Sequence, residues 1–239
     1  MGLVSQRVER SDLEAGDHIY TWRTAFTYSH HGIYVGENKV VHFTHFSSSS
    51  SNTRATCLDI PDCGFKKDGS GVIMSCLNCF LGDGSLYRFE YGVSTPTFIA
   101  RFRGGTCTTA NPDPSETVVH RAMYLLHKGF GNYDLFTNNC EDFALYCKTG
   151  RLVRRSKKRE APMGCSGQAT SFVGVPLAAV IALPLQMIFS GPVVFAASTA
   201  ATYSFNRYST DIGVRGDVVE VRVEGLELFH GDESTQPGN

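Results

Sequence analysis

One cysteine and two upstream histidine motifs are the residues best suited to chemistry in this chain. Cys140 lies in the run NNCEDFA at 138–144, and the histidines lie in YSHHGIYVG at 28–36 and VVHF at 40–43. A cysteine becomes a nucleophile when a neighbouring histidine accepts the thiol proton, and a third group, such as a second histidine, commonly orients that base. The sequence therefore predicts a cysteine acyl-transfer enzyme, provided that the fold brings the three motifs together.

The two histidine motifs are predicted to lie on a β-hairpin. A strand at 32–36 and a second strand at 40–43 are separated by a turn. This hairpin would bring His30 and His42 close together across the sheet. Because side chains alternate between the two faces of a strand, His30 and its neighbour His31 would point in opposite directions, and only one of them can face the site.

Cys140 is predicted to lie at the start of a helix. Asn138 and Asn139 are good N-cap residues, and Gly150 is a good terminator. Free backbone N–H groups and the positive end of the helix dipole would stabilise a thiolate in the first turn. We therefore expect the pKa of Cys140 to lie below the usual value of about 8.5. The helix face that carries Cys140 would be turned toward the sheet, together with Phe143, Ala144 and Cys147.

These motifs resemble those of the lecithin retinol acyltransferase and H-rev107 family, a circularly permuted branch of the NlpC/P60 papain-like hydrolases. The resemblance runs from Gly16 to Phe143, with the histidines before the cysteine, and is strongest to the plant NC-domain group. It implies an α+β fold in which an antiparallel sheet packs on helices. It also implies that Cys140 is the nucleophile, that His30 is its base and that His42 holds this base in the correct tautomer.

The resemblance implies an enzyme that acts on lipid esters. The thiolate would attack an ester carbonyl, with a phospholipid as the default acyl donor, and the thioester would pass its acyl group to an amine, a hydroxyl or water. The activity is then that of an acyltransferase or of a phospholipase A, and it requires no cofactor. A catalytically silent binding or scaffold protein with the same fold is the alternative from another class, and a thiol peptidase is the third interpretation.

Four further cysteines lie in a segment, about 51–85, that is interpreted as an irregular insertion: Cys57, Cys63, Cys76 and Cys79. The last two form a Cys-x-x-Cys pair, which commonly supplies two ligands to a structural zinc ion, whereas the first two are more widely spaced. The segment is poor in apolar residues and would gain stability from a bound metal. A zinc site with four thiolates is one interpretation, and free thiols in a loop are the other.

The last third of the chain has a distinct composition. Residues 151–159 include six basic residues, whereas 161–206 contain no charged residue and are strongly apolar from Phe172 onward. A basic segment before an apolar one predicts attachment to a membrane surface, with the catalytic domain on the cytoplasmic side. Three prolines spaced eight residues apart favour a hairpin or re-entrant insertion over one straight helix. A helical pair packed on the main domain is the alternative.

Length and charge set the remaining limits. A chain of 239 residues can form one substantial core. We expect a catalytic domain over 1–150, a membrane-associating region over 151–206, and a strand-like segment with a disordered tail over 207–239. The net charge of −1 gives no general attraction to nucleic acid. The polar N-terminus differs from a secretory signal peptide, so we expect an intracellular protein with free thiols; the organelle stays open, plastids included.

Overall fold

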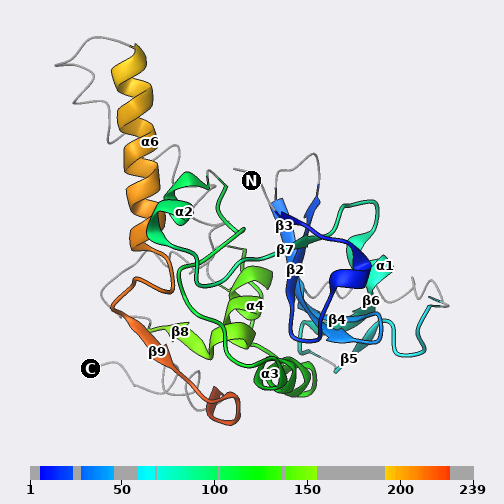
Figure 1. Cartoon of the computed structure of the whole chain (residues 1–239). Coiled ribbons are helices and arrows are strands. Elements are labelled where there is room, and N and C mark those ends of the chain that lie inside the picture. Colours follow the sequence, from blue (N-terminus) through cyan, green and yellow to red (C-terminus); the bar gives the residue numbers. More distant parts are fainter. Residues whose placement is uncertain are drawn as a thin grey trace, which may run out of the picture.

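The computed structural model describes residues 6–23, 28–45, 57, 59–67, 69–101, 103–135, 138–154 and 192–226. Its main element is a seven-stranded sheet with helices packed against it (Figure 1). Neighbouring strands run antiparallel throughout this sheet. The fold therefore belongs to the α+β class that the sequence predicts.

Long strands form the middle of the sheet and short strands form its edges. The four long strands are β2 (His18–Arg23), β3 (Tyr28–Gly36), β4 (Lys39–Phe43) and β6 (Val72–Cys76). The short strands are β1 (Gln6–Arg7), β5 (Phe65–Lys66) and β7 (Tyr87–Arg88). The order across the sheet is β1-β7-β2-β3-β4-β6-β5. Both histidine motifs therefore occupy the centre of the sheet.

The predicted hairpin is present as β3 and β4. Glu37 and Asn38 form its two-residue loop with φ angles of 50° and 63°. Positive φ at both central residues is characteristic of the type I′ turn, whose twist matches that of the flanking strands. The loop thereby fixes the register that sets His42 beside the strand of His30.

Two helices cover one face of the sheet. They are α3 (Ser115–Lys128) and α4 (Cys140–Thr149), and both pack against β3 and β4. The core between the two layers is built from buried apolar side chains, among them Ile33, Val41, Phe43, Met74, Val118, Ala122, Leu125, Phe143 and Ala144. The side chain of the N-cap residue Asn139 accepts two backbone hydrogen bonds from the first turn of α4, and Gly150 ends the helix in the left-handed conformation. These are the two boundaries that the sequence predicts for this helix.

A short helix packs against the opposite face of the sheet. This helix is α1 (Leu77–Leu81), and its Leu77 and Phe80 side chains join Ile19 and Val40 in a second apolar cluster. The segment that the sequence suggests to be irregular therefore supplies the inner strand β6 as well as α1. Glycine, lysine and cysteine obscure its periodicity, and β6 is stabilised by pairing along its length with β4, which no local pattern reveals.

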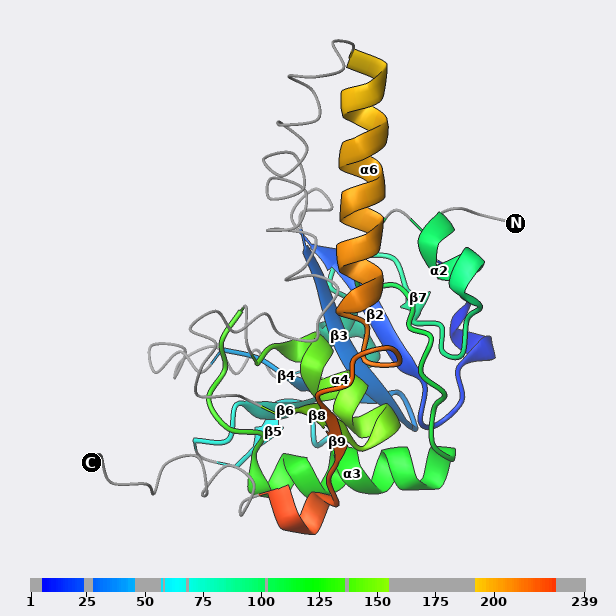
Figure 2. The ribbon, with the colours of Figure 1, turned by 90° about the vertical axis from the view of Figure 1, so that its left-hand side faces the viewer.

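The C-terminal part of the chain returns to the main domain. Strand β8 (Arg151–Val153) pairs with β9 (Val218–Glu220), which precedes a short 3₁₀ turn, η3 (Val223–Gly225). Helix α6 (Pro192–Ser209) projects away from the sheet and its covering helices (Figure 1 and Figure 2). The base of α6 is fixed by Arg207, whose guanidinium donates a 2.8 Å hydrogen bond to the carbonyl of Phe98 in α2 (Thr95–Ala100).

Within the described ranges, no helix combines the length and the apolar composition needed to cross a membrane. Of the apolar region, the structure describes helix α6. Two of its side chains are largely exposed to solvent: Val193, with 78% of its surface exposed, and Phe205, with 70%. The predictions for the prolines at 176 and 184, for most of the basic segment and for the tail over 230–239 fall outside the described residues.

Candidate active site and cysteine cluster

A chain of hydrogen bonds joins His30 to two partners across the sheet. The Nε2 atom of His30 lies 2.9 Å from Nδ1 of His42, and Nε2 of His42 lies 2.9 Å from Oγ of Ser75. Strands β3, β4 and β6 each supply one of the three residues. The hairpin thus brings together the two histidines that the sequence predicts to be close.

Phe80 and Gly32 shape the space around this histidine pair. The Phe80 ring in α1 lies with its centroid 5.3 Å from that of His30 and 5.4 Å from that of His42. A Cβ atom at position 32 would lie 3.0 Å from the Phe80 ring and 3.1 Å from Cβ of His42. Glycine in the motif HHGIYVG therefore lets strand β3 approach the second histidine closely.

The proton positions along this chain follow from a single requirement. If His30 is to accept a proton at Nδ1, its Nε2–H must donate to Nδ1 of His42. His42 then carries its proton on Nε2 and donates it to the hydroxyl oxygen of Ser75. In the described part of the chain, Nδ1 of His30 has no hydrogen-bond partner, so this nitrogen is open to accept a proton.

His31 lies on the other face of β3 and is engaged at both ring nitrogens. Its Nδ1 atom lies 2.8 Å from Nε2 of His18, and its Nε2 atom lies 2.8 Å from Oγ of Ser29. His18 in turn contacts the Tyr91 hydroxyl at 2.8 Å, and the His31 side chain is fully buried. A ring whose two nitrogens are both occupied has no lone pair to offer a thiol.

Cys140 is the first residue of α4, and its side chain is almost completely buried, with 3% exposed. The thiol donates to the backbone carbonyl of Ser29 at a sulfur–oxygen distance of 3.8 Å and also contacts the backbone N–H of His31. The Tyr133 hydroxyl lies beside the same sulfur. The thiol therefore contacts the backbone of β3 at the residues directly before and after His30. Its described contacts are with these backbone atoms and with Tyr133, not with an imidazole ring.

Burial sets the ionisation of both groups. It raises the pKa of Cys140 to about 12, because it outweighs the hydrogen bond from the backbone of His31, and the negative charges of Glu141 and Asp142 act in the same direction as burial. Burial, and to a lesser extent the charge of Arg23, lowers the pKa of His30 to about 4. The expectation that the helix start lowers the thiol pKa is therefore wrong for this closed state, in which thiol and imidazole are both neutral at pH 7.

The first turn of α4 contains one further group of interest. The Asn139 side chain accepts hydrogen bonds from the backbone N–H groups of Glu141 (2.8 Å) and Asp142 (3.2 Å). Within the described residues, the Cys140 N–H has no backbone or side-chain acceptor other than its own sulfur. This N–H lies at the positive end of the helix dipole and is free to donate to a negatively charged oxygen.

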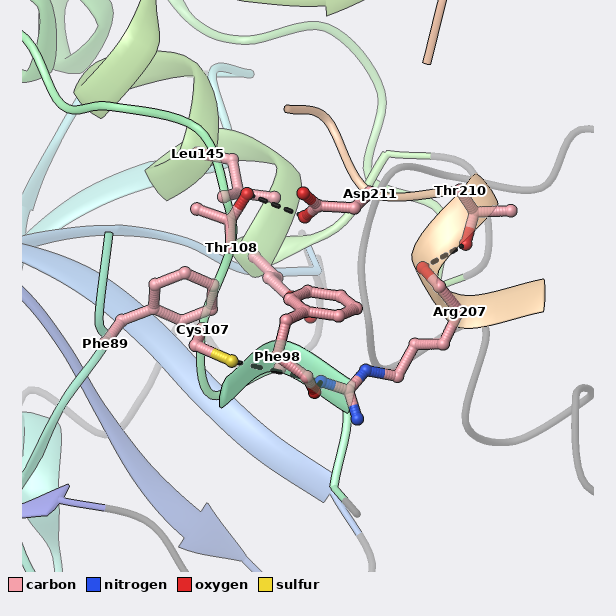
Figure 3. Close-up of a pocket in the computed structure, with 10 residues that line it drawn as sticks. Phe89, Phe98, Cys107, Thr108, Leu145, Arg207, Thr210 and Asp211 are labelled. Carbon is pink, nitrogen blue, oxygen red and sulfur yellow. Dashed lines mark hydrogen bonds between the residues drawn. The ribbon is translucent and has the colours of Figure 1, made fainter. Parts of the chain in front are cut away.

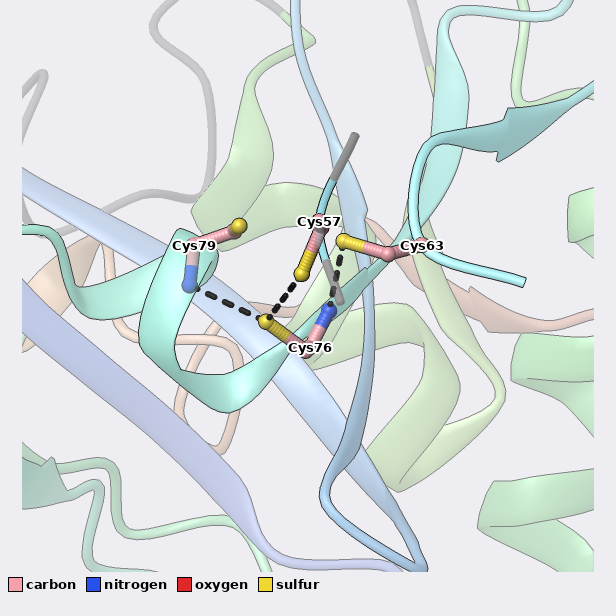
Figure 4. Close-up of side chains that lie close together, drawn as sticks. All are labelled: Cys57, Cys63, Cys76 and Cys79. Atoms are coloured by element: carbon pink, nitrogen blue, oxygen red, sulfur yellow. Dashed lines mark hydrogen bonds between the residues drawn. The ribbon is translucent and has the colours of Figure 1, made fainter. Parts of the chain in front are cut away.

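The four cysteines of the 51–85 segment come together in space (Figure 4). The Sγ atoms of Cys57, Cys63, Cys76 and Cys79 all lie within 4.8 Å of one another. Cys76 ends strand β6 and Cys79 lies in α1, whereas the other two approach from the loop before β5. The sequence suggests these four residues as metal ligands, and the structure brings their sulfur atoms together.

A pocket beside α4 lies apart from these groups. It is enclosed by α2, α4 and the base of α6, and neither the histidine pair nor Cys140 lines it (Figure 3). Two of its lining side chains hold the fold together: Asp211 accepts a 2.6 Å hydrogen bond from the Thr108 hydroxyl, and Arg207 donates to the carbonyl of Phe98. We interpret it as the joint that fixes α6, not as a substrate site.

Sequence reasoning did not find Ser75, Phe80 or Tyr133. Ser75 and Phe80 lie in the segment interpreted as an insertion, directly before Cys76 and directly after Cys79. The apolar, partly β-branched run Val72-Ile73-Met74 could have indicated strand β6, and with it a serine at position 75 near His42. Tyr133 lies in a loop that precedes α4, and no local pattern marks it.

Comparisons with known proteins agree with this architecture. Residues 11–153 match the family model described as lecithin retinol acyltransferase, and this range includes β2, β3, β4, β6 and α4. The chain is also 49% identical over 241 residues to Protein LEAD-SENSITIVE 1 of Arabidopsis thaliana, an alignment that covers 95% of this chain and 90% of that protein. The matched range spans well over half of the protein. It contains Cys140 and the three hydrogen-bonded residues His30, His42 and Ser75. The protein therefore belongs to the lecithin retinol acyltransferase family.

Proposed function

We propose that this protein transfers acyl groups from membrane lipid esters through a thioester on Cys140, with His30 as the base and His42 as the residue that orients it. Membership of the family suggests an activity of the acyltransferase or phospholipase type. The observation that carries the proposal is the hydrogen-bonded chain from His30 through His42 to Ser75. Within the described residues this chain leaves Nδ1 of His30 without a partner, and the Cys140 thiol contacts the backbone of the same strand. The His30 ring packs against α1 whereas Cys140 begins α4, so the proposal requires the imidazole and the thiol to approach each other when the substrate binds.

The first step forms the thioester. Nδ1 of His30 accepts the thiol proton as the sulfur forms a bond to the ester carbonyl carbon, and the carbonyl π electrons move to the oxygen. The N–H of Cys140 donates a hydrogen bond to this oxyanion. When the carbonyl re-forms, the ester C–O bond breaks, and the departing alkoxide takes the proton from His30. The products are a lysolipid or other alcohol and an acyl-cysteine.

The second step releases the acyl group. An amine, a hydroxyl or a water molecule gives a proton to His30 while it attacks the thioester carbonyl, and the thiolate leaves and recovers this proton. Water makes the protein a phospholipase, and an amine or hydroxyl makes it an acyltransferase. The same three side chains serve both outcomes, so the choice depends on which acceptor occupies the site.

The ionisation of the closed site determines how the proton moves. Burial raises the pKa of the Cys140 thiol and lowers that of the His30 imidazole, so a preformed thiolate–imidazolium pair is disfavoured. The proton would therefore move as the sulfur attacks, which is general-base catalysis. Because Cys140 is 3% exposed, the substrate must also displace a covering group, and Tyr133 lies beside the sulfur.

A membrane surface is the proposed location of the substrate. Six of the nine residues over 151–159 are basic, and the following 161–206 contain no charge. From this region, α6 projects from the body of the protein and exposes Val193, Val194 and Phe205. Basic side chains attract anionic headgroups, and exposed apolar side chains gain free energy by entering the interface. This arrangement supports a lipid as the acyl donor.

Intact-protein mass spectrometry tests the proposal. The purified full chain is incubated with phosphatidylcholine vesicles, and we expect an added acyl mass that hydroxylamine removes, as it does for a thioester. Cys140→Ala should abolish the adduct. Cys147→Ala, which removes another buried thiol of the same helix, should retain it. If the folded wild-type chain forms neither an adduct nor lysolipid, the proposal fails and a catalytically silent binding protein becomes the better interpretation.

A further inference from the structure

We propose that Cys57, Cys63, Cys76 and Cys79 bind one zinc ion as a closed four-thiolate site. The four sulfur atoms lie within 4.8 Å of one another, and the sulfurs of Cys57 and Cys76 are 3.3 Å apart. A tetrahedral site with zinc–sulfur bonds of about 2.3 Å requires sulfur–sulfur distances of about 3.8 Å. The four side chains therefore already converge on one point, and small rotations about their side-chain bonds would complete the tetrahedron (Figure 4).

Backbone hydrogen bonds to the sulfurs are an independent observation that points to thiolate ligands. The N–H of Cys79 donates to Sγ of Cys76 at 3.3 Å, and the N–H of Cys76 donates to Sγ of Cys63 at 3.2 Å. Donors of this kind reduce the negative charge on a metal-bound sulfur and orient it. Cys76 is the N-cap residue of α1 and Cys79 lies in its first turn, so the chain itself fixes the spacing of these two sulfurs.

The ligand set favours zinc in a structural role. Soft thiolates select zinc, copper(I) or iron over magnesium and calcium, and four protein ligands leave no open position for a substrate or a catalytic water. Asp59 lies outside the ligand set: its carboxylate accepts hydrogen bonds from Sγ of Cys76 (3.4 Å) and from the Asn78 amide (2.6 Å). Zinc would replace the proton on Cys76, and the Asn78 amide would continue to hold the carboxylate.

The site joins two parts of the chain that few apolar contacts hold together. Cys57 and Cys63 come from the loop before β5, and this loop buries only one apolar side chain, Ile60, among its described residues. Cys76 and Cys79 belong to the corner between β6 and α1. A metal that binds all four would fix this loop to the corner and thereby contribute folding free energy.

The same corner supports the histidine pair. Ser75 precedes Cys76 and contacts His42, and Phe80 follows Cys79 and packs against both His30 and His42. We infer that zinc acts as a positioning element, because it fixes the residues that hold the base in its working tautomer. This consequence rests on the proposed function, whereas metal binding itself does not.

Metal content and coordination are measured first, on the purified full chain. We expect one zinc per chain by elemental analysis. Replacement by cobalt(II) should give the sulfur-to-metal charge-transfer band and the strong visible absorption of a tetrahedral thiolate site. A folded chain without metal, with four freely alkylated thiols or with disulfides at these positions, would overturn the proposal. One equivalent of iron in place of zinc would overturn the metal assignment.

Matched variants then separate the metal site from the chemistry. Cys79→Ser changes the exposed ligand, and we expect it to lose zinc to a chelator concentration at which the wild-type chain keeps it. Cys107→Ala, which changes a cysteine outside the cluster, should retain full zinc. If zinc positions the base, metal-depleted protein that is still folded should form the Cys140 adduct at least about tenfold more slowly, and added zinc should restore the rate.

The two proposals fail in different ways. If the protein binds zinc but never forms an acyl adduct, the metal site is supported and the acyl-transfer proposal is contradicted. An adduct that forms at the same rate with and without zinc would leave the enzyme standing and overturn the positioning role. Absence of bound metal in an active, folded chain would remove the zinc site alone.

Discussion

His30 and His31 are adjacent in sequence and differ completely in their surroundings. His30 shares a hydrogen bond with His42, and its other nitrogen has no partner among the described residues. His31 uses both nitrogens in a buried network with His18 and Ser29. The alternation of side chains along β3 separates the two environments. Their substitution should therefore affect different properties of the protein.

We expect His30→Gln to reduce the rate of acyl-adduct formation by about 10²- to 10⁴-fold, the usual contribution of a general base, with little loss of stability. His31→Gln should do the opposite. It leaves buried partners on His18 or Ser29 unsatisfied, at a cost of about 1–3 kcal/mol each, and should change the rate per folded molecule by less than tenfold. Adduct kinetics and urea unfolding of both variants measure the two effects. A larger rate loss in His31→Gln than in His30→Gln would contradict the assignment.

The raised pKa of Cys140 predicts a slow thiol. Because the pKa of about 12 keeps the thiolate fraction small at pH 7, iodoacetamide should modify Cys140 at least about 100-fold more slowly than free cysteine, whose pKa is about 8.5. The rate should keep rising above pH 9. Peptide mass spectrometry after timed alkylation distinguishes Cys140 from the other thiols. Fast modification that is independent of pH between 5 and 8 would instead show a thiolate–imidazolium pair.

Helix α4 positions the thiol through its first turn. Its N-cap side chain, Asn139, accepts hydrogen bonds from two backbone N–H groups, and the Asp142 carboxylate accepts one from the backbone of Asn139 at 3.1 Å. This reciprocal pair fixes the orientation of the turn in which Cys140 lies. Three of the four N–H groups that lack an intrahelical partner at the helix start are used in this way, and among the described residues that of Cys140 is left for the reaction.

Removal of this cap should be measurable in both stability and rate. We expect Asn139→Ala to lower the free energy of unfolding by about 1 kcal/mol, within the usual range of about 0.5–2 for a lost N-cap, and to slow adduct formation. Asn139→Ser keeps a hydroxyl acceptor and is the matched control. Urea denaturation gives the stability. Equal unfolding free energies for the alanine and serine variants would show that the cap contributes nothing.

Four histidines with lowered pKa values make the stability of the folded protein depend on pH. Burial is the largest cause for His18, His30, His31 and His42. The folded protein keeps these rings neutral, whereas the unfolded chain protonates them below the ordinary value of 6.5. As pH falls from about 6.5 toward the folded-state pKa, about 4 for His30, the unfolded state therefore binds more protons and stability is lost.

We expect the free energy of unfolding to be constant above about pH 7.5 and to fall steeply between pH 6.5 and pH 4. Each such histidine contributes up to about 1.4 kcal/mol per pH unit, and all four act in the same direction. Urea titrations at pH 7.5, 6 and 5 measure this slope. Equal unfolding midpoints at pH 7.5 and pH 5 would contradict neutral, buried histidines.

The C-terminal part is integral to the protein beyond the range of the family match. Val223 and Leu226 are buried in the core formed by the sheet and α3–α4, and β9 completes a pair with β8. Asp211 accepts hydrogen bonds from Thr108 and from the backbone N–H of Thr109 (3.0 Å), which ties the base of α6 to the main domain. The C-terminal end of the projecting helix α6 is therefore fixed to the main domain.

The amino-acid sequence by itself determined the hairpin of the histidines and the helix of Cys140. The turn at Glu37–Asn38, the caps at Asn139 and Gly150, and the order of the three motifs are local signals, and each corresponds to an element of the structure. Alternation along β3 also indicated that His30 and His31 separate to opposite faces. These features could be predicted because neighbouring residues specify them.

Tertiary structure alone decided what surrounds these residues. It placed Ser75 against His42, brought four cysteines from two segments to one point, and buried Cys140 so deeply that desolvation outweighs the helix dipole. It also turned an apparently irregular segment into the strand β6. Strand pairing, burial and the meeting of distant side chains depend on contacts between residues far apart in the chain, and no local pattern contains that information.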